Sequence, residues 1–299
     1  MKSVTIWGLK NKRNSLRFIH KGFYENFMKL GYDTRWVNDE ARNQNIQSDI
    51  FFVSGVASKH IKFNKSAIYI LHNVELSDND AEYIKRNNIN HLNLQVFTKD
   101  AYGEILQNGN TIYNHEINTL FQPWGTPLSP NEWYPYVPKN RFKIEFWVGS
   151  IWNNQMNQGN KAIMNTYKQI LRKHGVTLIK RGGSKLNING LSDSKNSQLV
   201  RKSRIGATIV GEWQKSVSYI PCRLFKNISF GVAPISNMKA PIFLNNKNGF
   251  IDNLQDLINF AMSESDNEKI LRLESARDDL RMFTYEENIK RIVKVLASR

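Results

Sequence analysis

The hydrophobic positions of this chain alternate between short apolar runs and longer amphipathic stretches. The first run, Ser3–Trp7, is followed by Gly8 and then by Ser15–Leu30, where apolar residues recur every three to four positions. That spacing predicts a helix, whereas a short apolar run predicts a buried strand. Gly31 ends the helix and Thr34–Val37 begins a second strand, so the pattern predicts a strand–helix–strand unit.

Three further apolar runs end in small or polar residues. They are Ile50–Val53, Ala67–Leu71 and Leu94–Phe97. The carboxyl ends of parallel strands form the sheet edge where ligands bind. His72 follows the second run, and its pKa near neutrality makes it our first candidate for a general base, although it would equally suit a turn cap. Asp39 and Glu75 are the carboxylate alternatives at the same edge.

The acidic pair Asp78 and Asp80 has the Asp-x-Asp spacing of some metal sites. It lies between Ser77 and a helix predicted over Ala81–Asn87. A serine at the N-cap and acidic residues in the first turn stabilise a helix start. We therefore predict a capped helix here and no metal site.

Prolines gather in the middle of the chain, where Leu120–Lys143 holds five of the eight. Proline removes a backbone donor and stiffens the chain, which predicts a linker. We expect an N-terminal domain over 1–122, a linker over 123–142 and a C-terminal domain over 143–283. A final helix over about 284–299 is expected to pack back on the first domain.

The strand–helix–strand pattern restarts after the linker. Lys143–Val148 ends at Gly149 and Ser150, a helix is predicted over Lys161–His174, and the next strand ends at Arg181 and Gly182. Small residues at such an edge let the main chain approach a ligand closely.

The stretch Tyr219–Asn237 combines an arginine with a predicted helix start. Helical spacing continues to Gly231, and the apolar run Val232–Ile235 predicts a strand, weakened by the proline inside it. Arg223 lies near the start of the helix, and a helix N-terminus with an arginine suits an anion. The hydroxyls of Ser218 and Tyr219 precede it, where they would bind phosphate or cap the helix.

The composition adds a strong positive charge. The formal net charge is +16 over 299 residues, which favours anionic partners such as nucleotide phosphates, and contact with anionic surfaces is a further option. Cys222 is the single cysteine, the N-terminus is too poor in apolar residues for a signal peptide, and no run is long enough to span a bilayer. We expect a cytoplasmic protein without a transmembrane segment.

The residues around Arg223 carry a family resemblance. Arg223-x-Phe225, Phe230-Gly231 and Ile235-Ser236 are similar to the C-terminal half of GT-B fold glycosyltransferases, and most similar to the CgeB-like, group 1 type. The match departs at Lys226, where that group has a glutamate that binds the donor ribose. The resemblance implies an α/β fold of two Rossmann-like βαβ domains facing across a cleft.

The resemblance also implies an activity and a set of site residues. The activity is metal-independent transfer of a hexose or pentose from a UDP- or GDP-sugar to a glycan hydroxyl, without a cofactor. The residues that would contact the donor are Gly149, Ser150, Arg181, Gly182, Ser218, Tyr219, Arg223 and Lys226. Those on the acceptor side are Gly8, Arg13 and Arg17, with His20 nearby.

Two other functions remain open. A nucleotide-sugar epimerase would share this layout. A basic nucleic-acid-binding protein would explain the charge, but no nucleic-acid-binding module is recognised, so we do not expect nucleic acid as a partner.

Overall fold

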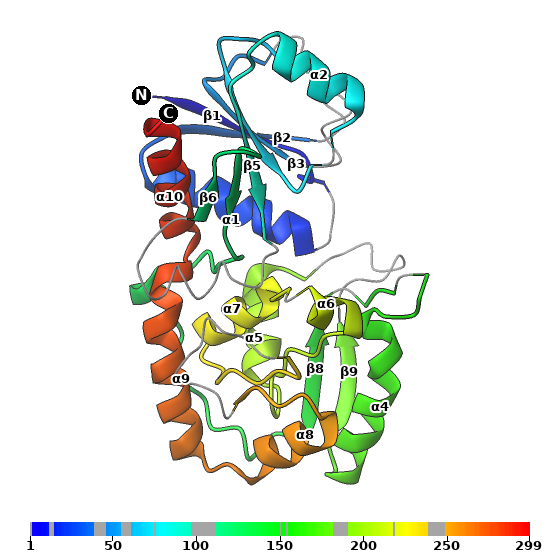
Figure 1. Cartoon of the computed structure of the whole chain (residues 1–299). Coiled ribbons are helices and arrows are strands. Elements are labelled where there is room, and N and C mark those ends of the chain that lie inside the picture. Colours follow the sequence, from blue (N-terminus) through cyan, green and yellow to red (C-terminus); the bar gives the residue numbers. More distant parts are fainter. Residues whose placement is uncertain are drawn as a thin grey trace.

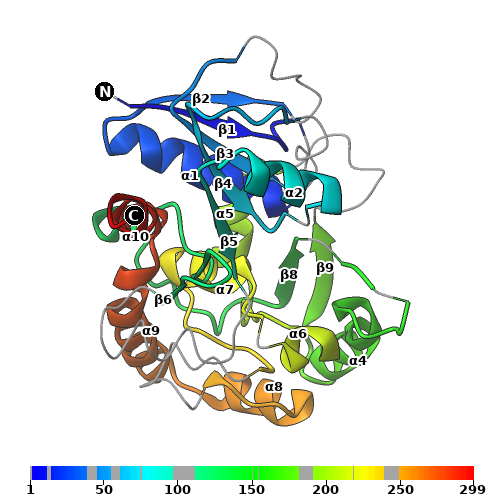
Figure 2. The ribbon, with the colours of Figure 1, turned by 45° about the horizontal axis from the view of Figure 1, so that its top comes forward.

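The computed structural model describes residues 2–11, 15–38, 46–54, 61–74, 76–96, 112–149, 151–153, 155–181, 191–217, 219–238 and 249–299. The chain forms two α/β lobes, with helices α9 and α10 running along one side of both (Figure 1). The second view shows the N-terminal sheet above the C-terminal lobe (Figure 2).

A seven-stranded sheet organises the N-terminal lobe, in the order β2-β1-β3-β4-β5-β7-β6. The strands are β1 (Ser3–Trp7), β2 (Asp33–Val37), β3 (Ile50–Ser54), β4 (Ile68–His72), β5 (His91–Gln95), β6 (Ile112–Asn114) and β7 (Thr119–Phe121). All neighbouring strands are parallel except β6 and β7. Helices α1 (Ser15–Lys29) and α2 (Asp78–Arg86) belong to this lobe. The parallel strands predicted from the apolar runs are present, and their carboxyl ends share one edge.

The C-terminal lobe is built around a parallel strand pair, β8 (Ile144–Val148) and β9 (Thr177–Arg181). Its α-helices are α4 (Asn160–Lys173), α5 (Asp193–Arg201), α6 (Glu212–Ser216), α7 (Cys222–Ser229), α8 (Leu254–Ser263) and α9 (Asp266–Leu280). Short 3-10 helices cover Pro130–Glu132 in the linker and Arg281–Phe283 before α10 (Tyr285–Ala297).

The strand predicted over Val232–Ile235 is not a regular strand in the structure. The pairing around it is reduced to single bridges, Thr208 with Ser236 and Ser236 with Phe250. A side chain replaces part of the ladder, because the Asn237 amide donates to the Val210 carbonyl (3.0 Å) and accepts from the Val210 amide (2.8 Å). The proline in this segment lacks a backbone donor, which further shortens the pairing.

Helix α10 returns to the N-terminal lobe and packs against α1. Gly22 allows this close approach, since a Cβ atom there would lie 2.4 Å from the ring of Tyr285. The main core runs from Ile19 and Phe23 of α1 through Tyr285 to Phe225 and Ile228 of α7. The two lobes are therefore joined by a continuous hydrophobic core.

The acidic pair behaves as predicted from the cap pattern. The Ser77 hydroxyl caps α2 by accepting from the Asp80 amide at 3.2 Å. Among the described residues, no group of three or more histidine, cysteine or acidic side chains is placed to hold a metal ion. None of the helices described here has the length and apolar character needed to cross a bilayer.

Candidate functional site: a cationic helix terminus between the lobes

The start of α7 places an arginine against the carboxyl end of β8. The guanidinium of Arg223 stacks on Trp147, with 3.8 Å between its central carbon and the ring centroid. Gly149 has φ +136°, and a Cβ atom there would lie 2.5 Å from a terminal nitrogen of Arg223. Glycine is therefore needed at position 149 for two reasons. Its backbone conformation is closed to most other residues, and a side chain would occupy the space of the Arg223 guanidinium.

The surroundings of Arg223 are buried and only partly compensate its charge. Burial lowers the pKa of Arg223 to about 10, against the attraction of nearby groups that include Glu145. That carboxylate is already engaged, because it accepts hydrogen bonds from the amides of Ile205 (2.8 Å), Gly206 and Ala207. Arg223 therefore retains capacity for an anionic partner.

Lys226 lies one turn further along α7 and is buried, at 6% exposure. Its ammonium donates to the Asn196 side-chain oxygen at 3.3 Å and lies 5.4 Å from the ring centroid of Phe18, across the lobe boundary. Burial lowers its pKa to about 8, and Arg223 adds repulsion. A lysine in this position cannot accept the ribose hydrogen bonds that a glutamate would accept.

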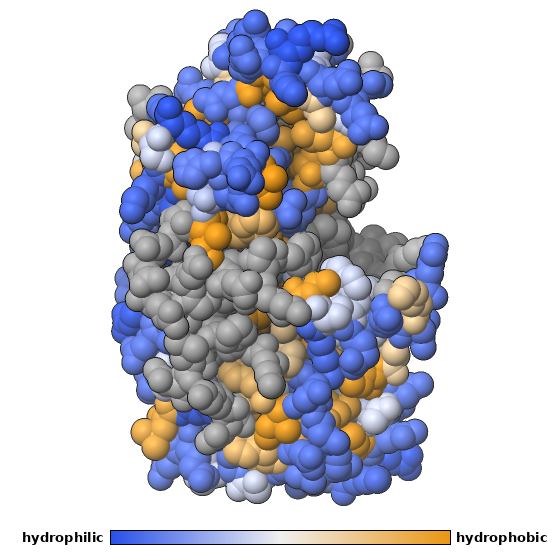
Figure 3. Space-filling view, viewed as in Figure 1, coloured by the Kyte–Doolittle hydropathy of each residue, from blue (hydrophilic) through white to orange (hydrophobic). Residues whose placement is uncertain are grey.

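Two cations thus lie on the same short helix, Arg223 beside its start and Lys226 in its last turn. Neither Arg223 nor Lys226 forms an ion pair with any carboxylate in the described part of the chain. Pro221 at the N-cap of α7 provides no side-chain acceptor for the first turn. The partial positive charge of the helix start adds to the two cations, so the arrangement suits phosphate oxygens. Figure 3 shows a hollow between the upper and lower lobes, on the right of the view.

The other predicted donor residues are placed less uniformly. Arg181 ends β9 with an exposed side chain, and its carbonyl accepts from the Gly149 amide at 3.3 Å. The Tyr219 hydroxyl accepts from the Trp124 indole at 3.0 Å, so this residue joins the C-terminal lobe to the linker. Ser150, Gly182 and Ser218 lie outside the described residues.

His72 lies at the carboxyl end of β4, as predicted, but it is enclosed. It is 3% exposed, its Nδ1 lies 3.3 Å from Nε2 of His20, and its ring packs on Phe52 and Trp124. Burial, followed by repulsion from His20, holds its pKa well below the usual value. A neutral imidazole fits a base, but this packing fits a structural role better. Asp39 and Glu75 lie outside the described residues.

The loop after β1 holds the predicted acceptor-side residues. Gly8 has φ +111°, and its carbonyl accepts from the Trp36 indole at 2.9 Å. Arg17 donates to the Lys10 carbonyl at 2.9 Å and stacks on Trp36, so it supports the loop. His20 is buried against His72, and Arg13 lies outside the described residues.

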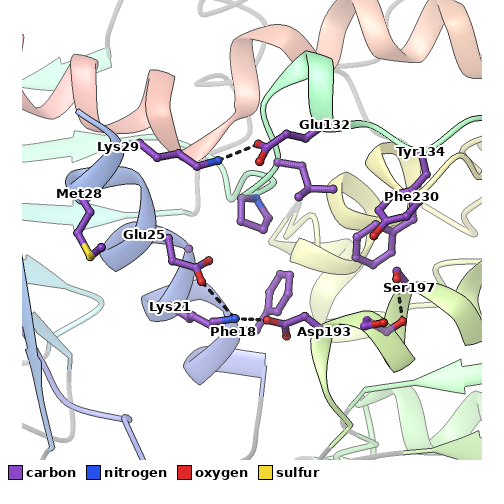
Figure 4. A pocket seen from close by; sticks show the side chains of 14 residues that line it. Phe18, Lys21, Glu25, Met28, Lys29, Glu132, Tyr134, Asp193, Ser197 and Phe230 are labelled. Atoms are coloured by element: carbon purple, nitrogen blue, oxygen red, sulfur yellow. Dashed lines mark hydrogen bonds and ion pairs between the residues drawn. The ribbon is translucent and has the colours of Figure 1, made fainter. Parts of the chain in front are cut away.

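A pocket of about 650 Å³ lies between α1, the linker and the C-terminal lobe (Figure 4). Two ion pairs flank it, Lys21 with Asp193 and Lys29 with Glu132 (2.8 Å). Phe18 and Phe230 line it, and the ammonium of Lys226 lies within 6.0 Å of both rings. Its walls come from both lobes, so a change in their relative position would change the pocket.

Sequence reasoning missed two partners of the cationic pair. Trp147 lies two residues before Gly149 on β8, and Asn196 lies on a separate helix. The position of Trp147 was predictable, because residues two apart on a strand face the same side. The contact with Asn196 depends on the packing of α5 against the lobe and leaves no local signal.

Comparison with known proteins gives a structural match alone. No family model matches the sequence, and no curated protein matches it. A solved "alpha-glucosyltransferase (AGT) in complex with UDP" superposes with a TM-score of 0.65 at 10% identity, covering 99% of this chain and 100% of that one.

Two further matches are complexes with DNA. An alpha-glucosyltransferase bound to UDP and a 13-mer DNA containing a HMU base gives a TM-score of 0.59 at 12% identity, over 98% of this chain and 99% of that one. Another alpha-glucosyltransferase, bound to UDP and a 13-mer DNA containing a central A:G mismatch, gives a TM-score of 0.57 at 11% identity. This match covers 99% of this chain and 100% of that one. These structures contradict our expectation of a glycan acceptor without nucleic acid as a partner, which was wrong.

The match spans both lobes of the chain. The predicted α/β fold with two Rossmann-like lobes of the GT-B type is therefore confirmed. The finer likeness to the CgeB type remains a prediction from the residues around Arg223.

Proposed function

We propose that this protein is a glycosyltransferase that moves a sugar from a nucleoside diphosphate to a hydroxyl group on a DNA base. The observation that carries the proposal is the pair of cations on α7, half-buried Arg223 at its start and buried Lys226 one turn later, both without an ion-pair partner among the described residues. Burying cations costs free energy unless an anion compensates them. A diphosphate is such an anion, and UDP is bound in the structures that share this fold.

The chemistry that follows needs stabilisation of the leaving group. The acceptor oxygen forms a bond to the anomeric carbon of the sugar, while the bond from that carbon to the diphosphate oxygen breaks. Negative charge then grows on the diphosphate beside Arg223, Lys226 and the first turn of α7. Fixed positive groups at that point lower the barrier, because they are oriented before the reaction begins.

The acceptor proposal rests on the structural matches and the charge. One matching structure contains DNA with a hydroxymethyluracil base, which carries a primary hydroxyl outside the normal base set. The net charge of +16 suits a polyanion. The hydroxyl proton would pass to a carboxylate, and Asp39 and Glu75, which follow β2 and β4 in the sequence, remain the candidates.

The test is transfer to defined duplexes, followed by mass spectrometry of the DNA. UDP- and GDP-sugars are each supplied with duplexes containing hydroxymethyluracil or hydroxymethylcytosine, and with matched thymine or cytosine duplexes. We expect a mass gain of one sugar on a hydroxymethylated duplex alone. Arg223→Ala should abolish this transfer, while Arg172→Ala, an exposed change on α4, should leave it intact. Absence of transfer to every hydroxymethylated duplex would refute the proposed acceptor.

A further inference from the structure

The loop between β8 and α4 projects from the C-terminal lobe (Figure 1), on the side where Figure 3 shows the hollow between the lobes. Its described residues are 151–153 and 155–159. Met156 lies at a turn in this loop and is 67% exposed, and Asn157 next to it has φ +56°. This loop thus exposes an unbranched apolar side chain to solvent.

Hydrogen bonds within the loop fix this shape. The Asn153 side chain accepts from the Gly159 amide (2.9 Å), and the Asn160 side chain accepts from the Trp152 amide (2.9 Å). The Gln158 carbonyl accepts from the Trp213 amide of α6 at 3.1 Å.

Two glycines let these segments pack closely. A Cβ atom added to Gly159 would lie 2.3 Å from the carbonyl oxygen of Trp152. A Cβ atom added to Gly211 would lie 2.3 Å from the carbonyl oxygen of Gln158. These contacts hold the loop without a partner, in a conformation that leaves Met156 exposed.

Half-buried aromatic rings connect the loop to the start of α7. Trp152 meets the edge of Trp213 with 5.7 Å between ring centroids, and Trp213 lies 6.2 Å from Tyr219. Tyr219 is four residues before Arg223 in the chain. A row of aromatic contacts therefore links the projecting loop to the segment that precedes Arg223.

We propose that this loop contacts duplex DNA and that Met156 enters the base stack beside the acceptor base. The inference rests on the proposed DNA acceptor. Apolar side chains such as methionine are inserted between base steps by proteins that unstack DNA. The exposed side-chain amides of Gln155 and Asn157 beside Met156 can donate hydrogen bonds to base edges and to the sugar–phosphate backbone.

A protein partner suits this surface less well. One exposed apolar side chain surrounded by amides is far smaller than the core of a stable protein interface. The charge of +16 also complements a polyanion. The amides, the wedge-like methionine and the charge together favour DNA.

The experiment compares Met156→Ser with the wild type on duplex and single-stranded acceptors. Single strands need no unstacking, so the variant should retain transfer there and lose about 10-fold in kcat/KM on a matched duplex. Leu271→Ser, which removes an apolar side chain of 71% exposure on α9, is the matched control and should change neither.

A second readout does not depend on transfer. A 2-aminopurine placed beside the acceptor base should become more fluorescent when wild-type protein binds the duplex, and Met156→Ser should remove most of that rise. Three results would each overturn the inference. They are no fluorescence rise with the wild type, a Met156→Ser variant with the wild-type kcat/KM on both duplex and single strand, and a variant that loses the same factor in kcat/KM on both substrates. Failure of the proposed function would instead appear as wild-type protein that transfers sugar to neither substrate.

Discussion

Replacing Lys226 with methionine should make the free protein more stable and the diphosphate complex weaker. The ammonium is 6% exposed, and burial lowers its pKa from 10.5 to about 8. That difference corresponds to about 3 kcal/mol against the charged form. The lost hydrogen bond to Asn196 and the lost contact with Phe18 offset part of it, so we expect a gain of about 1–3 kcal/mol at pH 7.

The gain should depend on pH in a defined direction. The folded protein holds the Lys226 proton less tightly than the unfolded chain, so the penalty is fully present below about pH 8 and disappears towards pH 10.5. Wild-type stability should therefore rise relative to the variant across that interval. Urea unfolding at pH 7 and at pH 9.5 measures the difference, with Lys168→Met, an exposed change on α4, as the control.

Binding of UDP should reverse the sign of the effect. A diphosphate next to Lys226 favours the charged form of this side chain. When UDP binds at pH 8.5, the wild-type protein should therefore take up protons, whereas Lys226→Met should not. Calorimetry in buffers of different ionisation enthalpy detects this uptake. The lost charged contact should weaken UDP binding by about 10- to 100-fold. A variant that is less stable than the wild type at pH 7 and binds UDP equally well would refute the reasoning.

Three other predictions follow from the same contacts. Gly149→Ala should displace the guanidinium of Arg223 and weaken UDP binding by about 10-fold or more; Gly175→Ala, at φ +68° with free space around the new Cβ atom, is the control and should leave UDP binding unchanged. His72→Gln should lower the free energy of unfolding by about 1–3 kcal/mol and change kcat by less than 10-fold. A fall in kcat of about 100-fold would instead indicate that His72 is the general base. DNA affinity should fall about 10-fold or more between 50 and 200 mM salt, as filter binding or anisotropy would show, and a flat response would exclude phosphate contacts.

Local sequence patterns were sufficient for most of the N-terminal lobe. Apolar runs such as Ile50–Val53 are buried on both faces of a parallel sheet, so composition and length alone reveal them. The cap at Ser77 was also predictable, because capping involves residues three positions apart. The β6–β7 hairpin was missed, since three-residue strands carry too little pattern.

Contacts between segments that are distant in the sequence limit how much of the site can be predicted. Gly149 and the helix start near Arg223 are both visible in the sequence, but only the family resemblance placed them in one site. The enclosure of His72 depends on His20 and Trp124, which come from a helix and from the linker. No local signal distinguishes a histidine at an open edge from one covered by such neighbours.

The acceptor was the largest error of the sequence interpretation. The charge of +16 was interpreted as favouring nucleotide phosphates, and the basic residues are spread along the whole chain without a cluster that would indicate nucleic acid. A folded surface can bring dispersed lysines and arginines together without any cluster in the sequence. The DNA in two structures of the same fold gave the correction.

Calorimetric titration of UDP into the wild type, Arg223→Ala and Arg172→Ala tests the central claim most directly. The account predicts binding by the wild type and by Arg172→Ala, and a loss of at least about 10-fold in affinity for Arg223→Ala. Equal affinity in all three proteins would contradict the claim that the start of α7 holds the diphosphate.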